Sequence, residues 1–147
     1  MARRITVRGI IIKDGKIFAQ RLKKNEGKRD FWCMPGGGLD EGESLRDGLH
    51  REMIEETGVA PVIGKLLYLQ QFAEDDQEFL DFFYHITNAD DYEQIDFGST
   101  SHGELEIAEY GFIDPREHVV LPKFLQQVDI AHDAESSTSV QEFTYLN

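Results

Sequence analysis

The stretch from Gly37 to Val59 reads GGLDEGESLRDGLHREMIEETGV and carries the clearest local signals in the chain. Ser44 followed by Asp47 is a capping-box pattern at a helix start, and Gly58 stands where a left-handed residue ends a helix. These signals predict a helix over about residues 45–57. The glycines that precede it predict a loop that a backbone or a phosphate can approach closely.

Three glutamates lie on one face of this expected helix. Glu52, Glu55 and Glu56 are spaced by three and four residues, so their carboxylates project from the same side. Like charges at these spacings repel by about 0.2–0.5 kcal/mol per pair, and a neighbouring cation would relieve the repulsion. The acids border the apolar stripe that contains Leu49 and Met53. We therefore expect them at the rim of the core, where oxygen ligands suit Mg²⁺ or Mn²⁺.

The same stretch resembles a complete Nudix box. It has Gly37, five residues, Glu43, seven residues and then REMIEETGV from Arg51 to Val59. The preceding FWCMPGGG is also similar to the strand and loop before the box in Nudix hydrolases. The resemblance implies an α+β fold, the Nudix-type α/β/α sandwich with a mixed central sheet. It also implies a metal-dependent pyrophosphohydrolase that cleaves a nucleoside diphosphate linked to another moiety, by attack of an activated water.

The resemblance assigns the metal to the acids of the box. It implies that Glu52, Glu55 and Glu56 are the ligands, with Mg²⁺ as the expected ion and Mn²⁺ as an alternative. A further acid from outside the box usually joins such a site. Three acids near the end of a long loop are the candidates: Glu104, Glu106 and Glu109.

Other box residues are expected to support these acids. Arg51 can pair with Glu43 and brace the loop against the helix. Gly37 and Gly38 are expected to set the geometry of the loop next to bound phosphates.

The charge of the chain is strongly negative and unevenly distributed. The net charge of −13 argues against DNA or RNA as a partner. Residues 1–51 nevertheless hold 12 of the 15 Lys and Arg residues. Most of these cations are interpreted as a solvated face. Arg21 and Lys23 run toward the glycines and are candidates for contacts with substrate phosphates.

Length and composition predict one domain. The 147 residues, 40% of them hydrophobic, suit a single Nudix hydrolase domain over residues 1–147. No long apolar run or signal-peptide pattern is present, so we expect a cytoplasmic protein without a membrane partner, and a homodimer is left open. The single cysteine, Cys33, cannot form an internal disulfide and is interpreted as a buried thiol in a short strand at 31–34.

Apolar and β-branched runs predict two antiparallel pairs. Residues 5–13 and 16–22 flank Asp14-Gly15, which is typical of a tight hairpin turn. Residues 62–73 and 78–87 flank a polar segment and predict the second pair.

The C-terminal part is expected to add a strand and a helix. Residues 104–113 have strand-like character, and Pro122 is placed as the first residue of a helix running to about His132. Residues 133–147 are expected to be a mobile tail or a final strand that faces a partner.

The long segment from Asn88 to Gly103 is expected to select the substrate, because long loops in compact domains are often functional. Tyr92 and Phe97 are candidates for an aromatic contact at the rim of the site, and His102 is a candidate general base. The expected substrate is a nucleoside triphosphate or another small nucleotide-diphosphate derivative.

Two other functions are weighed against hydrolysis. A non-catalytic, nucleotide-sensing binding module with a Nudix fold would be expected to lose an acid of the box, and none is lost here. An isoprenoid-diphosphate isomerase is a second enzyme class, which the intact box and the short chain disfavour.

Overall fold

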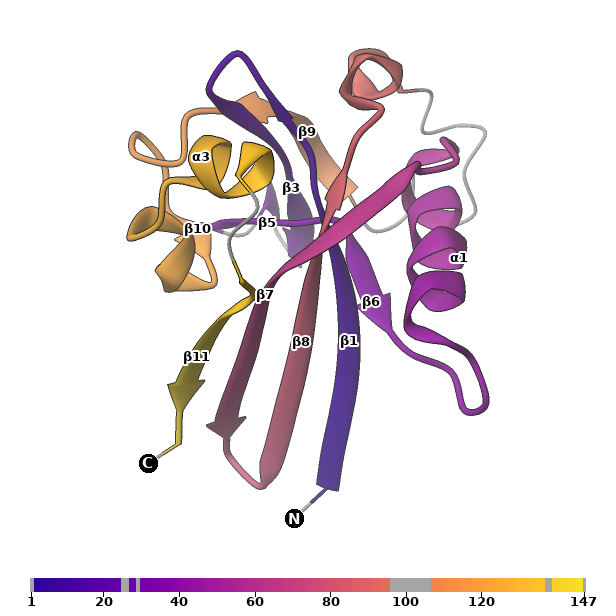
Figure 1. Cartoon of the computed structure of the whole chain (residues 1–147), viewed down its shortest axis with the longest axis vertical. Coiled ribbons are helices and arrows are strands. Elements are labelled where there is room, and N and C mark those ends of the chain that lie inside the picture. Colours follow the sequence, from indigo (N-terminus) through magenta and orange to yellow (C-terminus); the bar gives the residue numbers. More distant parts are fainter. Residues whose placement is uncertain (1, 25–26, 29, 96–106, 137–138, 147) are drawn as a thin grey trace.

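A computed structural model describes residues 2–24, 27–28, 30–95, 107–136 and 139–146, and it contains two mixed β-sheets flanked by helices (Figure 1). The first sheet has the strand order β11-β7-β8-β1-β6. Its strands are β1 (Ala2–Ile10), β6 (Gly36–Gly38), β7 (Ile63–Glu74), β8 (Gln77–Ile86) and β11 (Gln141–Tyr145). Within it, β1 runs parallel to β8 and β11 runs parallel to β7, whereas the other pairs are antiparallel.

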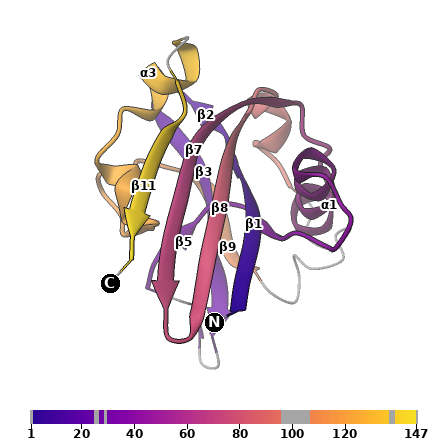
Figure 2. The ribbon, with the colours of Figure 1, turned by 60° about the horizontal axis from the view of Figure 1, so that its bottom comes forward.

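The second sheet has the order β10-β5-β3-β2, and β4 and β9 also pair with β3. Its strands are β2 (Ile12–Lys13), β3 (Lys16–Lys24), β4 (Gly27–Lys28), β5 (Trp32–Cys33), β9 (Ile107–Ile113) and β10 (Val120–Leu121). The helical segments are α1 (Leu45–Thr57), η1 (Ala89–Tyr92), η3 (Lys123–Gln126) and α3 (Ile130–Glu135). Figures 1 and 2 show α1 on one side of the sheets, next to β1 and β6, with α3 on the opposite side. The α+β sandwich with a mixed sheet is confirmed.

The helix of the box has the bounds that its capping signals predict. The Ser44 side chain accepts a hydrogen bond from the backbone N–H of Asp47 at 3.1 Å. At the other end Gly58 has a φ of 75°, and its N–H donates to the carbonyl of Ile54 at 2.9 Å. Both caps satisfy backbone groups that a helix end leaves unpaired.

The first hairpin differs from its prediction. The run 5–13 is two strands, because β1 ends at Ile10 and the chain passes at Ile11 from the first sheet into the second. The predicted turn is present, with Asp14 at a φ of 52° and Gly15 at 77°. Ile10 and Ile11 are both fully buried. A continuous apolar run therefore predicted burial correctly and did not reveal the change of sheet.

The core has two clusters that fix the helix relative to the sheets. One lies mainly between the sheets and contains Ile10, Ile17, Trp32, Tyr68, Phe83 and Phe124. The other packs α1 and contains Val7, Phe18, Leu49, Met53, Ile86 and Tyr92. Leu49 and Met53 are fully buried, and each such side chain contributes roughly 1.5–3 kcal/mol. Because this stripe is anchored, the acids beside it are held toward β6.

The single helix predicted from Pro122 to about His132 is wrong. Two short segments, η3 and α3, occupy this stretch, and Pro122 precedes the first of them. Asp129 begins α3, because its side chain accepts a hydrogen bond from the N–H of His132 at 3.1 Å. An aspartate in this position is a second start signal. Among the described residues, no helix is both long and apolar enough to cross a membrane.

The C-terminal segment joins the first sheet. Strand β11 pairs with β7, and the ring of Phe143 stacks on Phe124 with centroids 4.2 Å apart. Asp133, expected to begin a mobile segment, lies in α3 and is buried, where it accepts a hydrogen bond from the hydroxyl of Tyr68 at 2.6 Å. The final strand expected in this segment is therefore present over residues 141–145.

Candidate active site

The glycines before α1 form strand β6 instead of the predicted loop. β6 pairs with β1, and only Gly36 among its three residues has a positive φ, 140°. A Cβ at Gly36 would lie 2.0 Å from the carbonyl oxygen of Val7, so no other residue fits there. A Cβ at Gly37 would lie 2.6 Å from a carboxylate oxygen of Glu52. The glycines therefore let α1 bring its acids directly against the backbone of β6.

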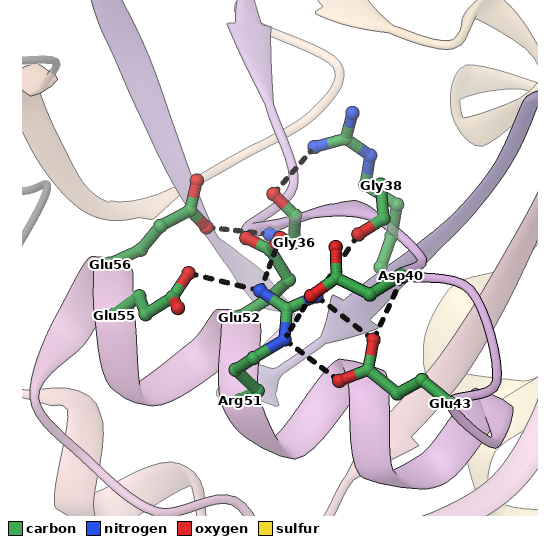
Figure 3. Close-up of polar contacts among 9 residues, drawn as sticks. Gly36, Gly38, Asp40, Glu43, Arg51, Glu52, Glu55 and Glu56 are labelled. Atoms are coloured by element: carbon green, nitrogen blue, oxygen red, sulfur yellow. Dashed lines mark hydrogen bonds and ion pairs between the residues drawn. The ribbon is translucent and has the colours of Figure 1, made fainter.

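Arg51 joins the helix to the segment before it, as predicted for its pair with Glu43. Its Nε and Nη2 donate to the two carboxylate oxygens of Glu43 at 2.8 and 3.0 Å, and Nη2 also donates to the carbonyl of Gly38 at 3.1 Å (Figure 3). The Arg51 guanidinium, helped by the N–H of Asp40, lowers the pKa of Glu43 to about 2. Glu43 is therefore a fixed negative charge that orients Arg51.

Two of the three predicted metal ligands, Glu52 and Glu55, contact the same nitrogen atom of the Arg51 guanidinium. Arg51 Nη1 lies 3.0 Å from Glu52 Oε1 and 3.1 Å from Glu55 Oε2 (Figure 3). The side chains of Glu52 and Glu55 are 14% and 28% exposed. The repulsion expected between these carboxylates is thus relieved by a cation from their own helix.

Glu56 has a different environment from its two neighbours. It is 7% exposed, and its Oε2 accepts the backbone N–H of Gly36 at 2.7 Å. Its Oε1 accepts a hydrogen bond from Gln20 Nε2 at 3.3 Å. Burial raises the pKa of Glu56 to about 7; the charge of Glu52 acts in the same direction, whereas Gly36 and Arg8 oppose it.

The donor atoms of this cluster suit a hard divalent cation. All three acids offer oxygen ligands. Gln20, whose Nε2 contacts Glu56, adds a fourth oxygen: its Oε1 is buried and has no hydrogen-bond partner in the part of the chain that the structure describes. A bound cation would stabilise the charged form of Glu56. Within the described ranges, no three His, Cys, Asp or Glu side chains already surround a common point as in a formed metal centre. The residues fit an ion chemically, provided that Arg51 Nη1 gives up its contacts with Glu52 and Glu55.

A cavity of about 670 Å³ is linked to this cluster through Arg8 and Gly36, although none of the three acids lines the cavity itself. Arg8 lines the cavity and donates from Nη1 to the carbonyls of Met34 and Gly36 at 3.2 and 3.3 Å. Arg4 also lines it and lies over Gly38, where an added Cβ would be 2.9 Å from Arg4 Nη2. The two arginines of β1 therefore connect the cavity with the strand that holds Glu56.

Arg21 and Lys23, the residues predicted to contact phosphates, lie on β3. The guanidinium of Arg21 is 3.7 Å from Glu109 Oε2 and 5.6 Å from the centroid of the Trp32 ring. Lys23 is exposed on β3. Neither residue lines the cavity, although both belong to the strand beside it.

Sequence reasoning missed Arg4, Arg8 and Gln20. The alternation of Arg4, Thr6 and Arg8 along β1 places these side chains on one face, which is a signal that the sequence contains. Gln20 offers no such signal, because its contact with Glu56 joins residues 36 positions apart.

Other predicted residues have mixed outcomes. Tyr92 is not at a rim, because η1 buries it completely and its hydroxyl donates to the carbonyl of Val59 at 3.0 Å. Cys33 is half-buried rather than buried, since it lines the cavity. Glu109 lies on β9 next to Arg21. Four other candidates lie outside the residues that the structure describes: Phe97, His102, Glu104 and Glu106.

Parts of the chain are similar in sequence to proteins with assigned names. A 51-residue segment is 43% identical to the 8-oxo-dGTP diphosphatase of Buchnera aphidicola subsp. Schizaphis graminum, covering 35% of this chain and 39% of that protein. A 63-residue segment is 41% identical to the ADP-ribose pyrophosphatase of Methanocaldococcus jannaschii, covering 43% of this chain and 37% of that protein. The matches thus span about two fifths of the length of these relatives.

The fold comparison covers more of the chain. The solution structure of the E. coli ORF135 protein has a TM-score of 0.69 at 20% identity, over 95% of this chain and 96% of that one. At this identity the likeness shows the fold. The family model described as the NUDIX domain matches residues 2–134. The chain therefore belongs to the NUDIX domain family.

Proposed function

We propose that this protein hydrolyses the diphosphate linkage of a small nucleotide with a divalent metal ion, Mg²⁺ or alternatively Mn²⁺, held by Glu52, Glu55 and Glu56. The observation that carries the proposal is the convergence of these carboxylates beside a cavity with two arginines in its wall. The names of the relatives, a diphosphatase and a pyrophosphatase, support the same class of reaction.

The residues of the cluster have different roles in the proposed reaction. When bound, the metal ion supplies neutralisation of phosphate charge and activation of a water. Arg51 keeps its bidentate contact with Glu43 and so positions the helix edge. A carboxylate of the cluster accepts the proton of the water that attacks phosphorus, and the bond from phosphorus to the bridging oxygen breaks. No covalent intermediate with the protein is needed.

The arginines of β1 are suited to the remaining phosphate charge. Arg4 and Arg8 lie on the face of β1 that lines the cavity, and Arg8 already donates to two carbonyls there. Guanidinium groups bind phosphate oxygens through paired, charge-assisted hydrogen bonds. The substrate then spans from the acids of α1, past β1, into the space between the sheets.

A panel of substrates tests the proposal. Purified protein is incubated with ribonucleoside and deoxyribonucleoside triphosphates and with ADP-ribose, in Mg²⁺, in Mn²⁺ and in EDTA, and products are separated by chromatography. Metal-dependent cleavage within a diphosphate linkage is the expected result. Binding of nucleotides without cleavage would instead identify a sensing module, and interconversion of isopentenyl and dimethylallyl diphosphate would identify an isomerase.

A further inference from the structure

A row of three polar side chains crosses the first sheet beneath the cavity. Thr6 on β1 is in register with Asp81 on β8, and Asp81 is in register with Gln70 on β7. All three are buried, and Asp81 and Gln70 line the cavity. Arg4 and Arg8 flank Thr6 at alternate positions of β1, so they share this face.

The hydrogen bonds of the row leave acceptor capacity toward the cavity. The hydroxyl of Thr6 donates to Asp81 Oδ1, and Gln70 Nε2 donates to Asp81 Oδ2 at 3.1 Å. Each carboxylate oxygen retains a lone pair, and the amide oxygen of Gln70 is not used in this bond. In the part of the chain that the structure describes, Asp81 makes no salt bridge. A buried carboxylate without a cation is costly, so its place on a cavity wall points to a ligand that donates hydrogen bonds.

Aromatic rings border the polar row. The rings of Phe72 and Phe79 stack with centroids 4.6 Å apart, and Tyr145 is in register with Phe72 on the next strand. Phe72, Tyr145 and Phe31 line the same cavity, with Phe31 coming from the segment that leads into the second sheet. Flat aromatic surfaces of this kind stack on nucleobases.

The strand order sets the direction of a bound nucleotide. From the acids, the order is β6, then β1 with its arginines, then β8 with Asp81 and β7 with Gln70. Neighbouring strands are about 5 Å apart. A nucleotide whose phosphates contact Arg8 and the edge of α1 would therefore place its base over Asp81 and Gln70.

We propose that Asp81 and Gln70 read the base of the substrate and favour bases with an exocyclic amino group over uracil and thymine; this rests on the proposed hydrolysis of nucleotides. Adenine, cytosine and guanine present amino donors to the two acceptors, and guanine adds an adjacent ring N–H. Uracil and thymine offer one ring N–H between two carbonyl oxygens, which the carboxylate repels. Discrimination by one good pair of hydrogen bonds is about ten- to hundredfold.

The test compares matched aspartates. Asp81→Asn keeps the shape of the side chain and replaces an acceptor by a donor. Asp133→Asn is the control, because Asp133 is equally buried, at 8%, and accepts a hydrogen bond from Tyr68 away from the cavity. For each protein, kcat/KM is measured with ATP, CTP, GTP and UTP, and the thermal midpoint is measured alongside.

The expected result concerns the ratio of rates. Wild type prefers the amino bases to UTP by at least about tenfold, Asp81→Asn lowers that ratio by about tenfold or more, and Asp133→Asn lowers the thermal midpoint without changing the ratio. Equal rates for all bases in wild type, or one common factor for all four in Asp81→Asn, would overturn the inference and leave nucleotide hydrolysis standing. If Asp81→Asn does not fold, Gln70→Met is measured against the same two criteria.

A binding arm separates this inference from the proposed function. If wild type hydrolyses neither these four nucleotides nor the deoxyribonucleotides and ADP-ribose of the substrate panel, the proposed function fails. Calorimetric titration with AMP, CMP, GMP and UMP then still measures base preference. Tighter binding of the first three, abolished in Asp81→Asn, supports base reading. Equal binding of all four, or binding of none, overturns it.

Discussion

Two regions of this molecule, the helix α1 and the polar row of the first sheet, hold their carboxylates differently. On α1, Glu52 and Glu55 share one cationic nitrogen of Arg51, which belongs to their own helix. In the first sheet, Asp81 is held by the neutral donors of Thr6 and Gln70, from strands distant in sequence. Acids stabilised by a movable cation can exchange it for a metal ion. A carboxylate satisfied by neutral donors is better suited to recognise a neutral group such as an amino group.

The largest effect on stability that separates the two regions is the pH dependence of unfolding. Glu56 has a pKa of about 7 in the folded protein against an ordinary value of 4.5. Below pH 4.5 both states hold the proton; between pH 4.5 and 7 the unfolded state ionises first, so metal-free wild type loses stability as pH rises. The full loss is about 3 kcal/mol.

Glu56→Gln removes this dependence. Urea unfolding in EDTA, repeated from pH 4.5 to 8, should show the variant gaining about 3 kcal/mol on wild type across the range. A difference between the two proteins that is constant with pH would contradict the buried, protonated state of Glu56.

Removing the internal cation should cost nearly as much in catalysis. Arg51→Met leaves Glu43, Glu52 and Glu55 without their shared guanidinium, so kcat/KM should fall by about 10- to 100-fold. Arg51→Lys restores the charge without the bidentate geometry and should recover only part of this loss. The measurement is steady-state hydrolysis together with the thermal midpoint. Equal activity of the lysine variant and wild type would show that charge alone is required.

The smallest effect on catalysis is expected from the contact between Tyr68 and Asp133. Tyr68→Phe removes the hydroxyl that donates to buried Asp133, so the unfolding free energy should fall by about 1–3 kcal/mol. Because neither Tyr68 nor Asp133 lines the cavity, kcat/KM and base preference should stay within about twofold of wild type. Loss of activity without loss of stability would show that the contact of α3 with β7 acts on the site.

Local features of the chain were predictable and long-range ones were not. The bounds of α1 follow from Ser44 and Gly58, and the contact of Arg51 with Glu43 joins neighbours on a helix and its entry loop. The β6 strand was not predicted because it forms by pairing with β1, which is distant in sequence. Val7 of β1 pairs with Gly37 of β6, 30 residues later in the chain. Glycine-rich sequence alone does not distinguish a loop from a strand against which a helix packs.

The polar row shows the same limit more clearly. Thr6 and Asp81 are 75 residues apart and come together only through the parallel pairing of β1 with β8. A shift of one residue in that register would turn Asp81 to the opposite face. Such registers are set by the packing of the whole sheet. The residues that line the cavity could therefore not be predicted from the sequence.

Catalysis by the acids of α1 is tested most directly by Mg²⁺-dependent turnover in three proteins: wild type, Glu56→Gln and Glu117→Gln. Glu117 is exposed and lies in the connection between β9 and β10, outside α1, so its variant controls for loss of a carboxylate in general. We expect a fall of about a thousandfold in kcat for Glu56→Gln, weaker Mg²⁺ binding in calorimetric titration, and wild-type values for Glu117→Gln. Hydrolysis and Mg²⁺ affinity near wild type in Glu56→Gln would contradict it.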